Sequence, residues 1–124
     1  MQLMTVTLAM ASGPGFPEGS PAHRYVLTLA LDGDGRPDAA AWLADPDPWP
    51  ALRIRPGEAD IHGDVQHDED GGWSLRFFGQ ADDRSDAPTT GLAAHEGLRP
   101  GAYVSVNEPE GEARAFRVVG VEAG

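Results

Sequence analysis

The chain has 124 residues and a formal net charge of −11, with 20 acidic residues against nine basic ones and no cysteine. This acidic balance argues against nucleic acid and anionic membrane surfaces as partners, because both would repel the chain. The missing cysteine excludes disulfides and thiolate metal sites, and the N-terminal stretch lacks the basic residues of a signal peptide, so we expect one soluble cytoplasmic domain over residues 1–124.

Alternating apolar residues predict two strands in the first third of the chain. Val6, Leu8 and Met10 alternate with smaller residues, as in a half-buried strand. A loop over residues 11–23 contains three prolines, and we expect it to be mobile. It leads to a second strand over residues 24–31, in which four large side chains share one face: Tyr25, Leu27, Leu29 and Leu31.

A turn over residues 32–37, rich in Asp and Gly, leads to a short segment over residues 38–44. Three consecutive alanines there could start a helix. Seven residues between turn signals are too few for a stable helix, however, so we expect an extended segment. The proline-rich residues 45–50 must also be extended.

The next segments predict a hairpin, with strands over residues 51–55 and 58–66. If Pro56-Gly57 is the whole loop, Arg53 faces Asp60 on the exposed side and Leu52 faces Ile61 in the core. Pro-Gly does not favour the twist-matched two-residue turns, so a longer loop stays open as an alternative.

A strand over residues 73–79 is expected to pair with the strand over residues 58–66, with Gly63 opposite Leu75. Gly63 then leaves room for a bulky neighbour or marks a bulge. Residues 80–90 are polar and expected to be mobile, and residues 89–97 hold the one expected helical turn.

A final hairpin over residues 102–107 and 113–121 places Val104 opposite Phe116 and Ala102 opposite Val118. About eight short strands in consecutive hairpins predict an all-β fold, either a small antiparallel barrel or a two-sheet sandwich.

Asp60, His62 and Asp64 are the first candidate metal ligands, because alternate residues share one face of a strand. The alternative is that this face is simply solvated and that Arg53 and Arg76 compete for the carboxylates. We favour the solvated face and expect no metal.

A second candidate metal site lies in the turn, where Asp32, Asp34 and Asp38 offer hard oxygen ligands. This stretch resembles the calcium loop of FG-GAP β-propeller repeats over about ten residues, with Ala30 at the leading acidic position. The resemblance implies a calcium site. A plain hairpin turn, in which Asp, Gly and Pro are expected anyway, is the preferred interpretation.

The same turn, with residues 25–31 and 39–43 on either side, is similar to the first hairpin of flavin-binding split barrels related to pyridoxamine oxidase. That similarity implies a flavin-dependent enzyme. No basic cluster that would hold a flavin phosphate follows downstream.

Trp49 stands between two prolines and is the candidate partner-binding residue. It is either an exposed anchor or folds back over one end of the barrel. We find no catalytic or cofactor-binding motif, and we expect a non-enzymatic module that binds a protein partner or self-associates. The alternatives are a carbohydrate-binding module that uses Trp49, and a metal- or flavin-dependent enzyme.

Overall fold

The computed structural model describes residues 3–11, 20–68, 72–77, 89–93, 97–107 and 113–123. This part of the chain forms eight strands and one short helix, α1 (Ala39–Ala44). The strands are β1 (Leu3–Met10), β2 (Ser20–Ala30), β3 (Trp49–Ile54), β4 (Ile61–His67), β5 (Trp73–Phe77), β6 (Thr89–Ala93), β7 (Tyr103–Asn107) and β8 (Ala113–Ala123).

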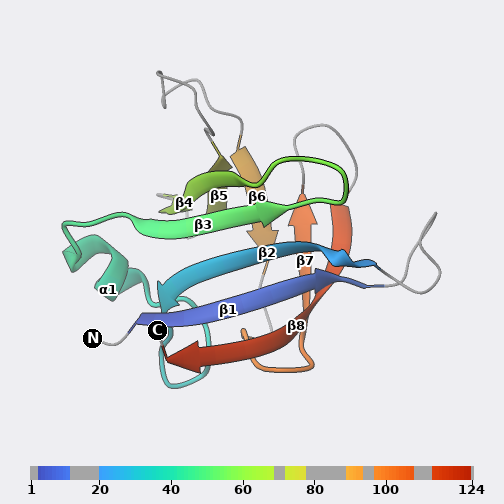
Figure 1. Ribbon diagram of the computed structural model, residues 1–124. Helices are drawn as coiled ribbons and strands as arrows, with labels where there is room; N and C mark the ends of the chain where they lie inside the picture. The colour runs from blue at the N-terminus through green and yellow to red at the C-terminus, as the bar shows by residue number, and fades with distance from the viewer. Residues whose placement is uncertain are drawn as a thin grey trace.

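The eight strands form one closed antiparallel barrel (Figure 1). Each strand pairs with the next along the chain, and β8 pairs with β1 to close the sheet. The all-β prediction is confirmed, and of its two architectures the barrel is the one observed. Every described strand pairs with a neighbour on both sides. The described sheet therefore has no open edge strand to which a partner could add a strand of its own.

Large apolar side chains fill the interior of the barrel, because alternate residues of each strand point inward. Tyr25, Leu27 and Leu29 of β2 are fully buried, as the pattern of that strand predicts. The largest fully buried side chains on the other elements are Val6, Leu8, Trp49, Val65, Leu75, Leu98, Val104, Val106 and Phe116. An eight-stranded barrel of this kind has little free space at its centre.

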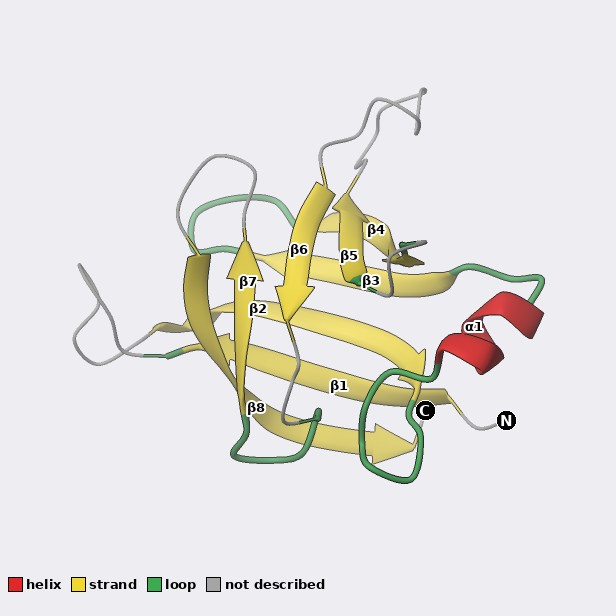
Figure 2. Cartoon of the chain, turned by 180° about the vertical axis from the view of Figure 1, so that it is seen from behind, coloured by secondary structure: helices red, strands yellow, loops and turns green. Residues whose placement is uncertain are grey.

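The expected extended segment at residues 38–44 is wrong, because Ala39–Ala44 form helix α1. Asp38 caps the helix through its side chain, which accepts a hydrogen bond of 3.1 Å from the Ala41 amide. The helix lies at one end of the barrel (Figure 2). Among the described residues, no helix has the length and apolar character needed to cross a bilayer.

One of the eight strands, β6, comes from the segment where a helical turn was expected. Thr89–Ala93 form β6, which pairs with β5 and β7, and residues 94–96 lie outside the described part. The helical prediction for residues 89–97 is therefore wrong over its first half. Thr89 and Thr90 are β-branched, and β-branched residues favour a strand.

The register between β3 and β4 differs by one residue from the prediction, so the faces of β3 are reversed. Arg53 pairs with Ile61 and points inward, whereas Leu52 pairs with His62 and points outward. The cause is the loop, which spans six residues between Ile54 and Ile61. The longer-loop alternative is the one observed. Pro56 and Gly57 form a turn closed by the Glu58 amide on the Arg55 carbonyl, with Gly57 at φ 75°.

The register between β4 and β5 is shifted by two residues from the prediction. Because side chains alternate with a period of two, the same residues of β4 and β5 still point inward. Gly63 lies opposite Phe77, and Val65 lies opposite Leu75. The final hairpin has the predicted register, with Val104 opposite Phe116.

Both expected mobile loops fall largely outside the described residues. Of the loop over residues 11–23, residues 12–19 lie outside, and residues 20–23 belong to β2. Of the segment over residues 80–90, residues 80–88 lie outside, and the remaining two residues begin β6.

Candidate functional site

Four aromatic rings meet at the end of the barrel where α1 lies. Trp49 and Trp73 are stacked, with their ring centroids 6.2 Å apart and their planes 6° from parallel. His67 lies 4.6 Å from Trp73 and 5.9 Å from Trp42, centroid to centroid. Because His67 ends β4 and Trp73 begins β5 directly opposite, the β4–β5 hairpin itself brings this pair together.

Two indole hydrogen bonds tie α1 and the loop after it to this cluster. Trp42 Nε1 donates to the Val65 carbonyl at 3.0 Å, and Trp49 Nε1 donates to Asp45 Oδ2 at 2.8 Å. The Asp47 amide and the Trp49 indole both donate to the Asp45 carboxylate, and they lower its pKa. No residue of the helix is fully buried, but Ala41 and Trp42 pack against the core, and these bonds add to that packing.

Trp49 is only 1% exposed, so its predicted role as an exposed anchor is wrong. Its other predicted placement, folded back at one end of the barrel, agrees with the structure. The carbohydrate-binding alternative depended on an exposed Trp49 and loses that support.

The β2–α1 turn is held by its own side chains and backbone. Asp32 Oδ1 accepts hydrogen bonds from the amides of Asp34, at 2.8 Å, and Arg36, at 3.0 Å. The Asp32 amide in turn donates to the Arg36 carbonyl at 2.8 Å. Since Asp38 caps α1, the predicted calcium ligands Asp32 and Asp38 both have local structural roles.

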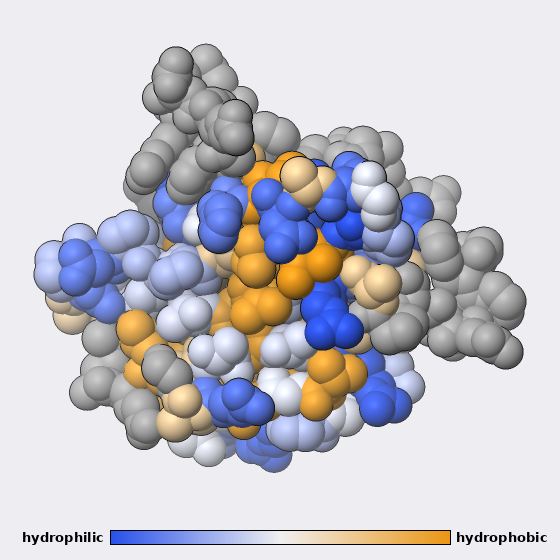
Figure 3. Space-filling model, in the orientation of Figure 1, coloured by the Kyte–Doolittle hydropathy of each residue, from blue (hydrophilic) through white to orange (hydrophobic). Residues whose placement is uncertain are grey.

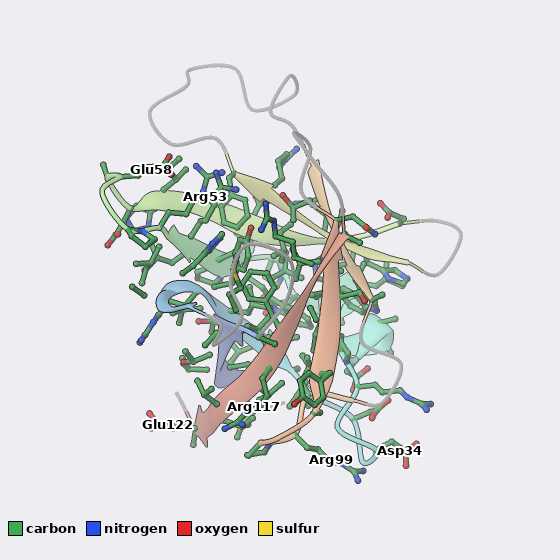
Figure 4. All side chains as sticks on the ribbon, turned by 90° about the vertical axis from the view of Figure 1, so that its right-hand side faces the viewer. Asp34, Arg53, Glu58, Arg99, Arg117 and Glu122 are labelled. Atoms are coloured by element: carbon green, nitrogen blue, oxygen red, sulfur yellow. The ribbon has the colours of Figure 1, made fainter. Side chains whose placement is uncertain are left out.

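The segment before β7 packs against the same turn. The Leu98 amide donates to the Gly35 carbonyl at 2.7 Å, and Arg99 Nη2 donates to the Asp34 carbonyl at 2.9 Å. Figure 4 shows Arg99 and Asp34 close together at the edge of the molecule. Gly97 has φ 85°, and a Cβ there would lie 2.8 Å from the Asp34 oxygen, so only glycine permits this close approach.

Between these features lies a partly open cavity of about 950 Å³. Its lining comes from the β2–α1 turn and the start of α1, and from the β4–β5 hairpin, β6 and the end of β7. Its charged and aromatic lining residues are Asp32, Arg36, His67 and Trp73. Small or apolar residues complete much of the remaining wall, namely Pro37, Ala39, Gly72, Gly91, Leu92 and Ala93, together with the amide side chain of Asn107.

The structure separates Asp60, His62 and Asp64, the first predicted metal ligands. Asp60 is exposed in the loop before β4, and His62 is exposed on the outer face of β4. Asp64 is buried, and its carboxylate accepts hydrogen bonds from Arg76 Nη2 at 3.2 Å and from the side-chain Nε2 of Gln66 at 2.7 Å. The predicted competition from Arg76 therefore agrees with the structure.

The predicted competition from Arg53 is wrong, because its guanidinium lies over the Phe77 ring at 5.9 Å. Among the described residues, no three His, Asp or Glu side chains gather as a metal site would require.

The flavin resemblance depended on a strand over residues 39–43 after the turn. Those residues belong to α1, so they do not form the second strand of the hairpin. The likeness therefore ends at the turn itself.

Sequence reasoning missed His67, Arg36 and the role of Trp73. None of these three residues was named as a candidate site residue. One available signal was that His67 and Trp73 flank the turn over residues 68–72, since a hairpin places such flanking residues opposite each other.

Comparison of the chain with protein-family models, with curated proteins and with solved structures finds no match.

Proposed function

We propose that this protein is a non-enzymatic binding domain that takes a small molecule into the cavity beside α1. The observation that carries this proposal is the cavity itself, about 950 Å³ in volume and bounded by the Trp73 and His67 rings. Binding sites for small molecules have volumes of this order, with apolar walls and a few polar groups.

The small residues in the wall support the proposal. Ala39 and Gly72 both line the cavity, and larger side chains at these positions would reduce its volume. The aromatic cluster is also built before any ligand arrives, because Trp49 packs behind Trp73 and the Val65 carbonyl holds Trp42. A preformed wall reduces the entropy lost on binding.

This proposal predicts that the fluorescent probe 1-anilinonaphthalene-8-sulfonate binds the folded protein and quenches tryptophan emission, because Trp73 lines the cavity. Ala39→Leu, which places a larger side chain in the wall, should weaken probe binding about tenfold or more. Titration of the probe, followed by fluorescence, measures both effects.

Ala115→Leu is the matched control, because Ala115 is exposed in β8 and is not part of the cavity wall. Circular dichroism of each variant checks that the barrel is intact. Equal probe affinity in the wild type, Ala39→Leu and the control would rule out this cavity as the site.

The second candidate function, self-association, has support from the outer surface of the barrel. Figure 3 shows an apolar stripe on the face formed by β2 and β3. Val26 and Leu52 pair across these two strands, and Leu52 and Ile54 share the outer face of β3. All three side chains are partly exposed.

A contiguous exposed apolar patch is typical of an interaction surface. Because the barrel is closed, a second copy would dock on this face and not along a strand edge. This candidate predicts a concentration-dependent dimer in sedimentation velocity, and Leu52→Ser should shift the protein towards monomer. The exposed Val119→Ser on β8 is the control, and a monomer at every concentration would contradict the candidate.

A further inference from the structure

His67 places a polar ring in the wall of the cavity beside α1. Its side chain shares the inner face of β4 with the buried Val65, because alternate residues of a strand point to the same side. The His67 ring packs against those of Trp42 and Trp73, with centroids 5.9 and 4.6 Å away. The position of the imidazole is therefore fixed by packing before any ligand binds.

The hydrogen bonds of the His67 imidazole are incomplete. A neutral imidazole has one donor nitrogen and one acceptor nitrogen. Nδ1 of His67 is shielded from solvent and has no hydrogen-bond partner among the described residues. Leaving such an atom buried without a partner costs stability, so a bound molecule that supplies the partner gains that energy on binding.

The ring can offer a nitrogen to the cavity from either of its long edges. A half-turn about the Cβ–Cγ bond leaves the outline of the ring unchanged and exchanges each nitrogen with a carbon. Every outer position of the ring is therefore a nitrogen in one of the two orientations. Because His67 lines the cavity, a ligand there meets a hydrogen-bonding group without any change in the packing around the ring.

The two charged residues of the described lining are already engaged. Asp32 Oδ1 accepts hydrogen bonds from the amides of Asp34 and Arg36. Arg36 has an interaction of its own. Asp32 and Arg36 are both exposed, whereas His67 and Trp73 are partly buried. The polar contact to a ligand within the cavity therefore falls to His67.

The surfaces around His67 indicate the class of ligand. Trp73 contributes an indole ring to the lining, and Leu92 and Pro37 contribute buried apolar side chains. A flat aromatic body matches these surfaces, because aromatic rings interact favourably with one another beyond the area that they bury. A hydroxyl matches the imidazole, because it both donates and accepts a hydrogen bond and so suits either tautomer.

We infer that the cavity binds an aromatic molecule with a neutral hydrogen-bonding group, such as a hydroxyl, and that this group bonds to the His67 imidazole. This inference rests on the proposed function and adds the chemical class of the ligand and the residue that selects it. It concerns binding alone and involves no covalent step.

Two probes of nearly equal size test this assignment: 2-naphthol carries a hydroxyl, and 2-methylnaphthalene carries a methyl group in its place. His67→Phe keeps an aromatic ring in the cluster and removes both nitrogens. In this variant we expect the ratio of the affinity for 2-naphthol to that for 2-methylnaphthalene to fall about tenfold, because only 2-naphthol loses a hydrogen bond. Any effect of Phe on the shape of the cavity acts on both probes and cancels in the ratio. Equilibrium dialysis of the full chain measures the affinities.

His62→Phe is the matched control. It makes the same substitution on the exposed outer face of the same strand, so its affinity ratio should equal that of the wild type. NMR of the wild type gives a second measurement that does not depend on the folding of a variant. The nitrogen resonances of the His67 ring should move more with 2-naphthol than with 2-methylnaphthalene.

The outcomes separate this inference from the proposed function. An unchanged affinity ratio in His67→Phe, with Ala39→Leu still weakening both probes, would overturn the inference and leave the proposed function standing. Equal movement of the His67 nitrogen resonances with the two probes would also overturn it. If neither probe bound the wild type, both the inference and the proposed function would be overturned.

Discussion

Gly63→Ala should destabilise the barrel by about 3 kcal/mol or more, or prevent it from folding. A Cβ at this position would overlap the carbonyl oxygen of Arg76 and come within 2.8 Å of the Phe77 ring. The first of these atoms belongs to the backbone of β5, which cannot move away without breaking its pairing with β4. Urea unfolding followed by circular dichroism measures the loss.

Gly120→Ala is the matched control for this substitution. Gly120 also lies in a strand of the barrel, but a Cβ there would meet no atom within 4 Å. We expect this variant to unfold within about 1 kcal/mol of the wild type. If both variants were equally stable, the close approach of β4 to β5 at Gly63 would be wrong.

The strands of this fold were predictable where side chains alternate clearly. The patterns at Val6, Leu8 and Met10, and at Tyr25, Leu27 and Leu29, gave the correct inward faces, because alternation with a period of two directly reflects the geometry of a strand. Closure of the sheet was not predictable, since β1 and β8 pair across almost the whole length of the chain and neither strand encodes its partner.

The errors had local causes that single residues explain. The faces of β3 were reversed because a two-residue loop was assumed, and Gly57 instead takes the left-handed conformation of a longer connection. Helix α1 was missed although Asp38 before three alanines is a capping signal. Its stability also depends on the Trp42 bond to Val65, a contact across 23 residues that no local pattern shows.

The candidate site was less predictable than the fold. Its walls come from the β2–α1 turn, the β4–β5 hairpin, β6 and β7, and these elements meet only once the barrel has closed. The sequence singled out Asp32 as a calcium ligand, whereas the structure assigns its Oδ1 to the turn that holds Arg36. Trp49, the predicted anchor, supports Trp73 from behind.

Stability should fall as the pH drops from about 6.5 towards 4, because of a buried histidine at the start of the barrel's second strand. Burial, together with the nearby guanidiniums of Arg55, Arg114 and Arg53, lowers the pKa of His23 to about 4, although Glu58 acts in the opposite direction. His23 is 8% exposed and packs its ring against core aromatic rings. The folded protein therefore favours the neutral form of the His23 imidazole.

The sign of the pH effect follows from comparing the two states. Above pH 6.5, His23 is neutral whether the chain is folded or unfolded, and its full contribution to stability is present. Between about 6.5 and 4, the unfolded chain binds a proton that the folded protein does not, so the free energy of unfolding falls as the pH falls. Over the whole window the loss is about 3 kcal/mol, of which about 2 kcal/mol comes between pH 7 and 5.

Urea unfolding at pH 7, 6 and 5 measures this slope in a range where most carboxylates stay ionised. His23→Gln has no proton to gain, so its stability should vary with pH by about 2 kcal/mol less than that of the wild type over the same range. His62→Gln is the matched control, because His62 is exposed on the outer face of β4, and it should keep the slope of the wild type. Identical slopes in the wild type and His23→Gln would show that His23 takes up its proton as readily in the folded barrel as in the unfolded chain, contrary to its burial against the Phe116 ring.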